Sequence, residues 1–171
     1  MNGFQAVSLA ISLMAFGSGS AGATTVIGDL NNFDTLNDTG QTCYGFEIEI
    51  DDIRSIDITY TFDWNHYGVP KIREDNTDPL HPKVFVRYES TKDSNGNWGA
   101  SGSFTNTALP TITPPAGHSC TDPTVNEGCE HFGVGYYGVP TTIKYNWLVD
   151  SAGTLVYFGT PVSVATLRWS P

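Results

Sequence analysis

The chain has 171 residues, of which 15% are charged and 12% aromatic, and its formal net charge is −10. This length suits one domain with a substantial core, and so little positive charge excludes the basic surface that nucleic-acid binding requires. Many turn-forming, β-branched and aromatic residues favour an all-β fold over a helical one.

The N-terminal stretch predicts a signal peptide. Residues 6–16 form an apolar run too short to cross a bilayer, and residues 21–23 match an A-x-A cleavage site, although residues 2–5 contain no Lys or Arg. We expect residues 1–23 to be removed and residues 24–171 to form one domain, either complete or part of a longer chain. The mature chain would then have no membrane span, and would be secreted, periplasmic or at the cell surface. The alternative is that the apolar run is a buried N-terminal strand or helix.

Two stretches near the start of the expected mature chain alternate as half-buried strands do. Residues 24–36 alternate loosely and end at a turn, residues 37–40, where Asn, Asp and Gly favour left-handed backbone conformations. Residues 44–50 alternate more clearly, with Glu47 and Glu49 on the face opposite the apolar residues. We expect these two carboxylates to lie on a solvated face.

The strongest period-2 pattern covers residues 56–64. The apolar members of this run are Ile56, Ile58, Tyr60, Phe62 and Trp64. Because polar residues alternate with them, we predict a central strand whose apolar side is buried. Residues 65–83 are broken by glycine and prolines, and the sequence predicts a long loop there.

The second half of the chain continues the strand pattern. Residues 84–89 predict a strand, and the Asn95-Gly96 pair predicts a hairpin turn. Further strands are predicted over residues 98–107, 111–113, 132–137, 143–149, 155–158 and 162–167. Roughly eight or nine short strands with no significant helix are typical of an antiparallel β-sandwich of the immunoglobulin-like or Greek-key type.

Two cysteines in the middle of the chain predict a disulfide. Cys120 and Cys129 flank a turn-rich segment, and export would expose them to an oxidising compartment. Cys43 would then be buried as a small apolar side chain, or would pair with one of the other two or with a second chain. The alternative is a zinc site made by His118, Cys120, Cys129 and His131, because residues i and i+2 of a strand share a face. Its spacing does not match the common zinc-finger patterns.

Acidic residues gather at two predicted turns. Asp51 and Asp52 follow one predicted strand, and Asp75 and Asp78 lie in the predicted loop. Clustered carboxylates can supply the oxygen ligands that calcium prefers, so these four are candidate calcium ligands. The alternative is an ordinary solvated acidic surface. No cofactor is certain from the sequence; calcium and zinc are the two that these residues would suit.

Aromatic residues near turns are candidates for ligand contacts, because exposed rings stack on sugars and anchor protein interfaces. These candidates are Tyr67, Trp98, Tyr136 and Tyr137. The alternative is that their rings cover the open ends of the sandwich. Two of them begin the same tetrapeptide, Tyr-Gly-Val-Pro, at residues 67–70 and 137–140.

The sequence contains no G-x-S-x-G, H-E-x-x-H, P-loop or dinucleotide-binding motif. It therefore predicts a non-enzymatic exported β-sandwich module with a binding or structural role, whose partner is an extracellular protein or a polysaccharide. The alternative is a secreted hydrolase or metal-binding protein with a carboxylate or His/Cys centre. A shallow aromatic surface would favour the binding module, and a deep cleft with two facing carboxylates would favour the hydrolase.

Overall fold

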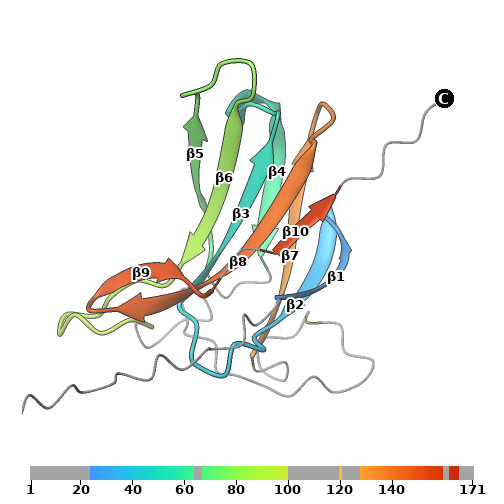
Figure 1. Cartoon of the computed structure of the whole chain (residues 1–171). Helices are drawn as coiled ribbons and strands as arrows, with labels where there is room; N and C mark the ends of the chain where they lie inside the picture. The colour runs from blue at the N-terminus through green and yellow to red at the C-terminus, as the bar shows by residue number, and fades with distance from the viewer. Residues whose placement is uncertain (1–23, 64–66, 100–119, 121–127, 160–161, 166–171) are drawn as a thin grey trace, which may run out of the picture.

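The computed structural model describes residues 24–63, 67–99, 120, 128–159 and 162–165. They form a sandwich of two antiparallel β-sheets (Figure 1). The first sheet has the order β1-β2-β7-β4: β1 (Thr25–Asp29), β2 (Asn32–Leu36), β7 (Cys129–Tyr136) and β4 (Ile58–Asp63). The second has the order β10-β8-β3-β6-β5, with β9 paired to β8: β10 (Val162–Ala165), β8 (Thr142–Ser151), β3 (Gly45–Asp51), β6 (Lys83–Glu89), β5 (Lys71–Asp75) and β9 (Thr154–Tyr157). The predicted all-β antiparallel sandwich is confirmed.

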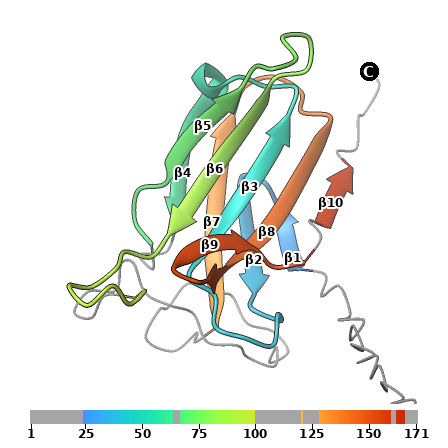
Figure 2. The same cartoon turned by 60° about the vertical axis from the view of Figure 1, so that its left-hand side comes forward.

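Figure 2 shows the two layers, with the second sheet in front of the first. No helix in the described part of the chain has the length and apolar character needed to cross a membrane. The expected signal peptide and the predicted strand at residues 111–113 lie outside the described residues, as does the predicted strand at residues 98–107 beyond residue 99. The structure adds β5, which falls inside the predicted loop. An exposed edge strand with mixed charges has no apolar alternation, so the sequence gives no signal for it.

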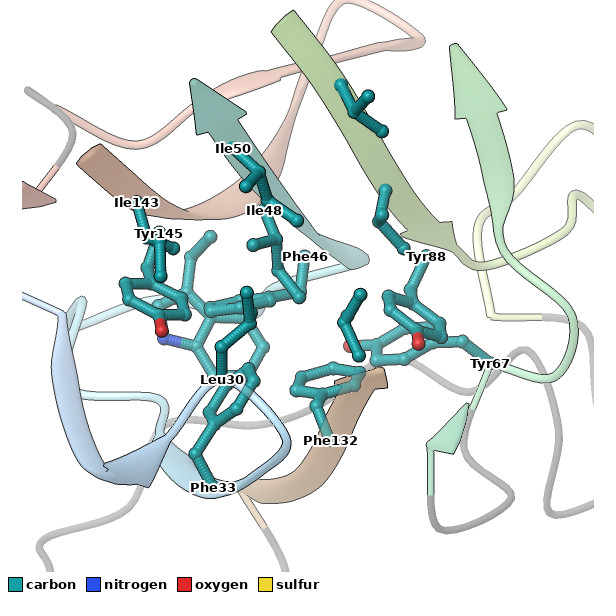
Figure 3. Packing of buried hydrophobic residues seen from close by; sticks show 14 of the residues in the cluster. Leu30, Phe33, Phe46, Ile48, Ile50, Tyr67, Tyr88, Phe132, Ile143 and Tyr145 are labelled. Carbon is teal, nitrogen blue, oxygen red and sulfur yellow. The ribbon is translucent and has the colours of Figure 1, made fainter. Parts of the chain in front are cut away.

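Aromatic side chains from both sheets meet in the core (Figure 3). The rings of Phe46 on β3 and Phe132 on β7 stack with centroids 4.9 Å apart, and Trp147 on β8 meets Phe46 edge-on at the same distance. All three side chains are fully buried, and burial of each contributes about 1.5–3 kcal/mol to stability. Ile143 and Tyr145 are also buried, which confirms the predicted inward face of β8.

β4 departs from the predicted register because it contains a β-bulge. Ile58 pairs with Tyr136, but Tyr60 pairs with Gly135, so Thr59 is an extra residue without a partner on β7. One extra residue exchanges the two faces of a strand from that point onward. Ile58 accordingly packs against the core, whereas Tyr60 is 48% exposed.

The prediction of a central strand over residues 56–64 with a buried apolar side is therefore wrong. β4 is an edge strand of the first sheet, and Ile56, which lies in the short 3-10 helix η1 (Ser55–Asp57), is 85% exposed. Phe62 lies on the outer face, where its ring covers Gly133 of β7. Trp64 lies outside the described residues.

The expectation that Glu47 and Glu49 face solvent is also wrong, because cationic side chains cover them. They are only 3% and 8% exposed. Arg87 Nη1 lies 3.2 Å from Glu47 Oε2, and the amino groups of Lys144 and Lys83 lie 2.7 and 2.9 Å from Glu49 Oε1. Burial alone would raise the pKa of Glu49, but hydrogen bonds from Lys144 and Lys83 outweigh it and lower the pKa. The outer face of the second sheet is thus a ladder of cross-strand ion pairs.

Candidate functional site

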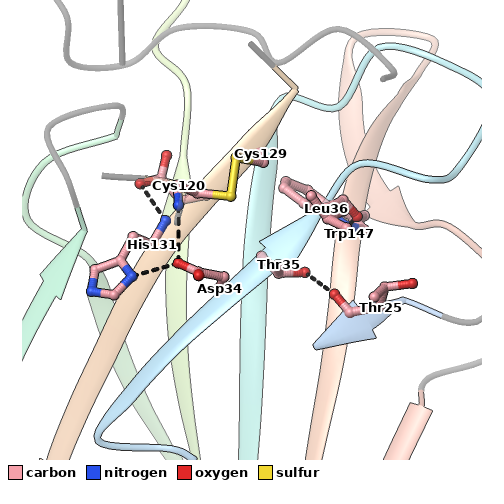
Figure 4. Close-up of a disulfide and its surroundings, with 9 residues drawn as sticks. Thr25, Asp34, Thr35, Leu36, Cys120, Cys129, His131 and Trp147 are labelled. Carbon is pink, nitrogen blue, oxygen red and sulfur yellow. Dashed lines mark hydrogen bonds and ion pairs between the residues drawn. A yellow bond between two sulfur atoms is a disulfide. The ribbon is translucent and has the colours of Figure 1, made fainter. Parts of the chain in front are cut away.

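A disulfide joins Cys120 to Cys129 at the start of β7 (Figure 4). The S–S distance is 2.00 Å and the two Cα atoms are 5.6 Å apart. Cys43 is free and fully buried. The predicted pairing and the predicted burial of Cys43 are both confirmed. The disulfide packs with Leu36 in a small apolar cluster that is separate from the main core.

The disulfide excludes the alternative zinc site, since bonded sulfurs cannot ligate zinc as thiolates. His131 faces a carboxylate instead: its Nδ1 lies 2.6 Å from Asp34 Oδ1 on the adjacent strand. The same oxygen accepts a hydrogen bond from the backbone N–H of Cys120, at 3.2 Å. Asp34 therefore ties both the histidine and the disulfide to β2. His118 lies outside the described residues.

The carboxylates proposed as calcium ligands face separate partners. These are Asp51, Asp52, Asp75 and Asp78. Asp51 lies 3.5 Å from the amino groups of both Lys83 and Lys144, and Asp52 lies 2.8 Å from Nδ1 of His81. Asp75 and Asp78 each accept a hydrogen bond from the backbone N–H two residues later. Within the described residues, no three His, Cys, Asp or Glu side chains come close enough to surround one metal ion.

The candidate ligand-contacting aromatic residues occupy different environments. Tyr67 is 3% exposed and belongs to the core, so the prediction that it contacts a ligand at the surface is wrong. Tyr136 packs against the core, and Tyr137 is 72% exposed. Of these four candidates, Trp98 is the one that lines a described pocket.

This pocket, called the Trp98 pocket below, has a volume of about 380 Å³. It is lined by Val69, Lys71, Arg87, Glu89, Ser90, Thr91, Lys92 and Trp98. Its walls come from the start of β5, the end of β6 and the turn that follows β6. Both views of the sandwich place this turn beside the β8–β9 hairpin (Figure 1 and Figure 2).

The indole of Trp98 is held in place by the turn and by the β8–β9 hairpin. Lys92 and Trp98 form an isolated backbone bridge across the turn, and Lys92 Nζ lies 4.5 Å from the centroid of the indole ring. Trp98 Nε1 donates to Asp150 Oδ1 at 2.9 Å, and Lys92 Nζ donates to the Gly153 carbonyl at 2.6 Å. Two segments distant in sequence therefore fix one half-buried ring.

The turn itself forms for local reasons. Asp93 Oδ1 accepts hydrogen bonds from the backbone N–H groups of Asn95 and Asn97, at 2.8 and 2.9 Å. Gly96 has a φ of 83°, a conformation that glycine adopts without a steric penalty. The hairpin turn predicted from Asn95-Gly96 is confirmed.

The charged wall of the Trp98 pocket has its carboxylate between two cations. Glu89 pairs with Lys71, and its Oε2 lies 2.8 Å from Arg87 Nε. Burial alone would raise the pKa of Glu89, but hydrogen bonds from Lys71 and Arg87 lower it, so the carboxylate is ionised at neutral pH. The side chain of Lys71 is 72% exposed, against 27% for Arg87 and 20% for Glu89. The side chain of Lys71 is therefore much more accessible to solvent than the carboxylate of Glu89 is.

A second, smaller pocket of about 270 Å³ adjoins the first. It is lined by Thr61, Phe62, Asp63, Gly68, Val69 and Pro70. Val69 lines both pockets and is 96% exposed, so it forms a ridge between them. Both pockets therefore border the segment between β4 of the first sheet and β5 of the second.

The sequence indicated Trp98 but not its charged neighbours. Lys71 lies in the stretch predicted as a loop, and Arg87 lies on a strand that carried no site signal. A two-residue turn at Asn95-Gly96 would place Asp93 opposite Trp98, whereas the structure pairs Lys92 with Trp98, so the position of Lys92 was not readable from the sequence either. Comparison of the chain with protein-family models, with curated proteins and with solved structures finds no match.

Proposed function

We propose that this chain is an exported, non-enzymatic β-sandwich module that binds an extracellular polysaccharide in the Trp98 pocket. The observation that carries the proposal is a fixed, half-buried indole among charged hydrogen-bonding side chains. A sugar ring has apolar C–H faces that pack on an aromatic ring, and hydroxyl groups that bond to charged side chains at its edge. The Trp98 pocket offers both kinds of contact.

The rigidity of the Trp98 side chain supports a binding role. Its Nε1 is bonded to Asp150, whose Oδ1 also accepts from the Gly153 N–H at 2.8 Å. A side chain that is already ordered loses little conformational entropy when a ligand binds. Export is supported by the Cys120–Cys129 disulfide, since structural disulfides persist in oxidising compartments.

A hydrolase is less well supported by the same pockets. Glycoside hydrolysis ordinarily requires two carboxyl groups that face each other across the scissile bond. Among the residues that line the two described pockets there is one carboxylate in each, Glu89 in the first and Asp63 in the second. Asp63 Oδ2 already accepts a hydrogen bond from the Gly68 N–H at 2.8 Å. These single carboxylates favour binding over hydrolysis.

The test is a binding survey of the mature protein, residues 24–171, against soluble and insoluble polysaccharides. Trp98→Ala should weaken binding of whichever polysaccharide is retained by at least about tenfold, because stacking on the ring is lost. The matched control is Tyr137→Ala, which removes an exposed ring that lines neither described pocket. Wild-type binding by folded Trp98→Ala, or equal losses in both variants, would overturn the proposal.

A further inference from the structure

We infer that the ligand of the Trp98 pocket is an anionic polysaccharide, whose charged oxygens pair with the ammonium groups of Lys71 and Lys92. This inference rests on the proposed binding function and specifies the chemical class of the ligand. The first observation is the distribution of charge. The chain has only 8 basic residues and a net charge of −10, yet Lys71, Arg87 and Lys92 line a single pocket.

The second observation is how these cations are neutralised. Arg87 pairs with Glu47 and Glu89, and Lys71 pairs with Glu89. Lys92 differs, because the partners of its ammonium group among the described residues are the Gly153 carbonyl and the indole ring. Neither of these carries a formal charge. An anionic group on a ligand would supply a counter-charge that the pocket itself does not place at Lys92.

The acidic side chains near the pocket do not offset its preference for an anionic ligand. Glu47 is 3% exposed and lies beneath Arg87, where a ligand does not reach it. Asp150 is not among the residues that line the pocket, and its Oδ1 is occupied by hydrogen bonds from Trp98 Nε1 and from the backbone N–H of Gly153. Glu89 lies between two cations and is less exposed than Lys71. A ligand that enters from solvent therefore meets the two ammonium groups first.

The third observation is the proximity of charge to the aromatic ring. Lys92 Nζ lies 4.5 Å from the indole centroid, so a sugar that packs beside Trp98 brings its own substituents within reach of the ammonium group. At physiological ionic strength, charges are screened over about 8 Å. The acidic remainder of the protein therefore repels an anionic chain weakly, while the contacts in the pocket keep their strength.

The experiment compares three probes of known charge: dextran, which is neutral; polygalacturonate, which carries carboxylates; and dextran sulfate. We expect the mature protein to bind at least one of the two anionic polymers at least tenfold more tightly than dextran. Preference between the anionic polymers distinguishes a carboxylate ligand from a sulfate ligand, and either result supports the inference. The affinity for the anionic polymer should fall as salt is raised from 50 to 500 mM.

Point variants test whether the preference for anionic polymers depends on the lysines of the Trp98 pocket. Lys92→Gln and Lys71→Gln should each weaken binding of the preferred anionic polymer several-fold, and by a larger factor than they weaken binding of dextran, which loses a hydrogen-bonding partner but no charge pair. The matched control is Arg73→Gln, which removes the same charge from the outer face of β5, where Arg73 lies over Phe85 outside the pocket. Should Lys71→Gln unfold because Glu89 loses a partner, Lys92→Gln still decides the question, since Lys92 lies on an exposed turn.

The outcomes separate the two proposals. If neutral polysaccharides bind as tightly as anionic ones and binding depends on Trp98, the proposed function stands and the anionic ligand is refuted. If Arg73→Gln weakens anionic binding as much as Lys92→Gln does, attraction is not local to the pocket and the inference fails. If the folded protein binds no polysaccharide, both proposals fail.

Discussion

The ring of Phe62 occupies the space above Gly133 on the neighbouring strand. A Cβ atom on that glycine would overlap Cε1 of Phe62 and also the backbone oxygen of Asn31. Tyr60 has the same relation to Gly135, and the rings of Tyr60 and Phe62 lie 6.2 Å apart with their planes 13° from parallel. Two glycines of β7 thus allow two aromatic rings of β4 to lie close against the outer face of the first sheet.

The first prediction is that Gly133→Ala lowers the free energy of unfolding by about 1–3 kcal/mol, as overpacking generally does. Part of this cost comes from the Phe62 ring and part from the Asn31 backbone. Phe62→Ala should therefore cost less in the Gly133→Ala background than in the wild type, because it relieves the first clash. Urea unfolding of the four proteins in this double-mutant cycle measures the difference. If the changes in unfolding free energy of the two substitutions simply add, the predicted contact between residue 133 and the ring of Phe62 is contradicted.

The second prediction separates the two faces of the sandwich. Phe46→Ala should cost about 3–5 kcal/mol, because Phe46 is fully buried between the sheets. Phe62→Ala should cost no more than about half of that, because its ring lies on the outer face and is only partly buried. Chemical denaturation measures both values. Equal costs would mean that Phe62 faces the core and that the bulge at Thr59 is absent.

The third prediction concerns the thiols. The unfolded, unreduced protein should show one reactive thiol and yield a peptide that links residues 120 and 129. In the native protein Cys43 should react slowly with a thiol reagent, because burial raises the pKa of its thiol to about 12 and leaves little thiolate at neutral pH. Ellman titration before and after unfolding tests both statements. Three thiols after unfolding, or rapid native labelling, would contradict them.

The fourth prediction is a loss of stability in acid that depends on Glu49. Its folded-state pKa is lowered by hydrogen bonds from Lys144 and Lys83, which outweigh the opposing effect of burial. A lowered folded-state pKa contributes stability above the ordinary value of 4.5, and that contribution disappears as the pH falls through the folded-state pKa. Glu49→Gln should therefore flatten the decline in unfolding free energy below about pH 4.5. The measurement is urea unfolding between pH 7 and pH 3, and identical slopes would refute it.

The positions of most strands follow from local sequence, because period-2 alternation and turn residues act over a few neighbours. β3, β6 and β8 are recognisable in this way, and so is the Asn95-Gly96 turn. The Cys120–Cys129 pairing was also predictable, since its two partners are close in sequence and no other cysteine is near them.

The face that a strand presents was not predictable in the same way. The bulge at Thr59 exists only where β4 pairs with β7, a partner some seventy residues later in the chain. The burial of Glu47 likewise depends on Arg87, which β6 brings alongside. The Trp98 pocket needs β5, β6 and the β8–β9 hairpin together, so its composition is a property of the assembled sheet.

The two copies of the Tyr-Gly-Val-Pro tetrapeptide separate what local sequence determines from what it does not. By itself the sequence determined the local backbone of both copies: Gly68 and Gly138 have φ values of 81° and 97°, which glycine adopts most readily. Only the tertiary structure decided whether each tyrosine is buried or exposed. Tyr67 is 3% exposed and stacks on Phe132 at 6.4 Å, whereas Tyr137 is 72% exposed. Backbone preference acts between adjacent residues, but burial depends on what distant strands place against a side chain, and the identical residues meet different neighbours.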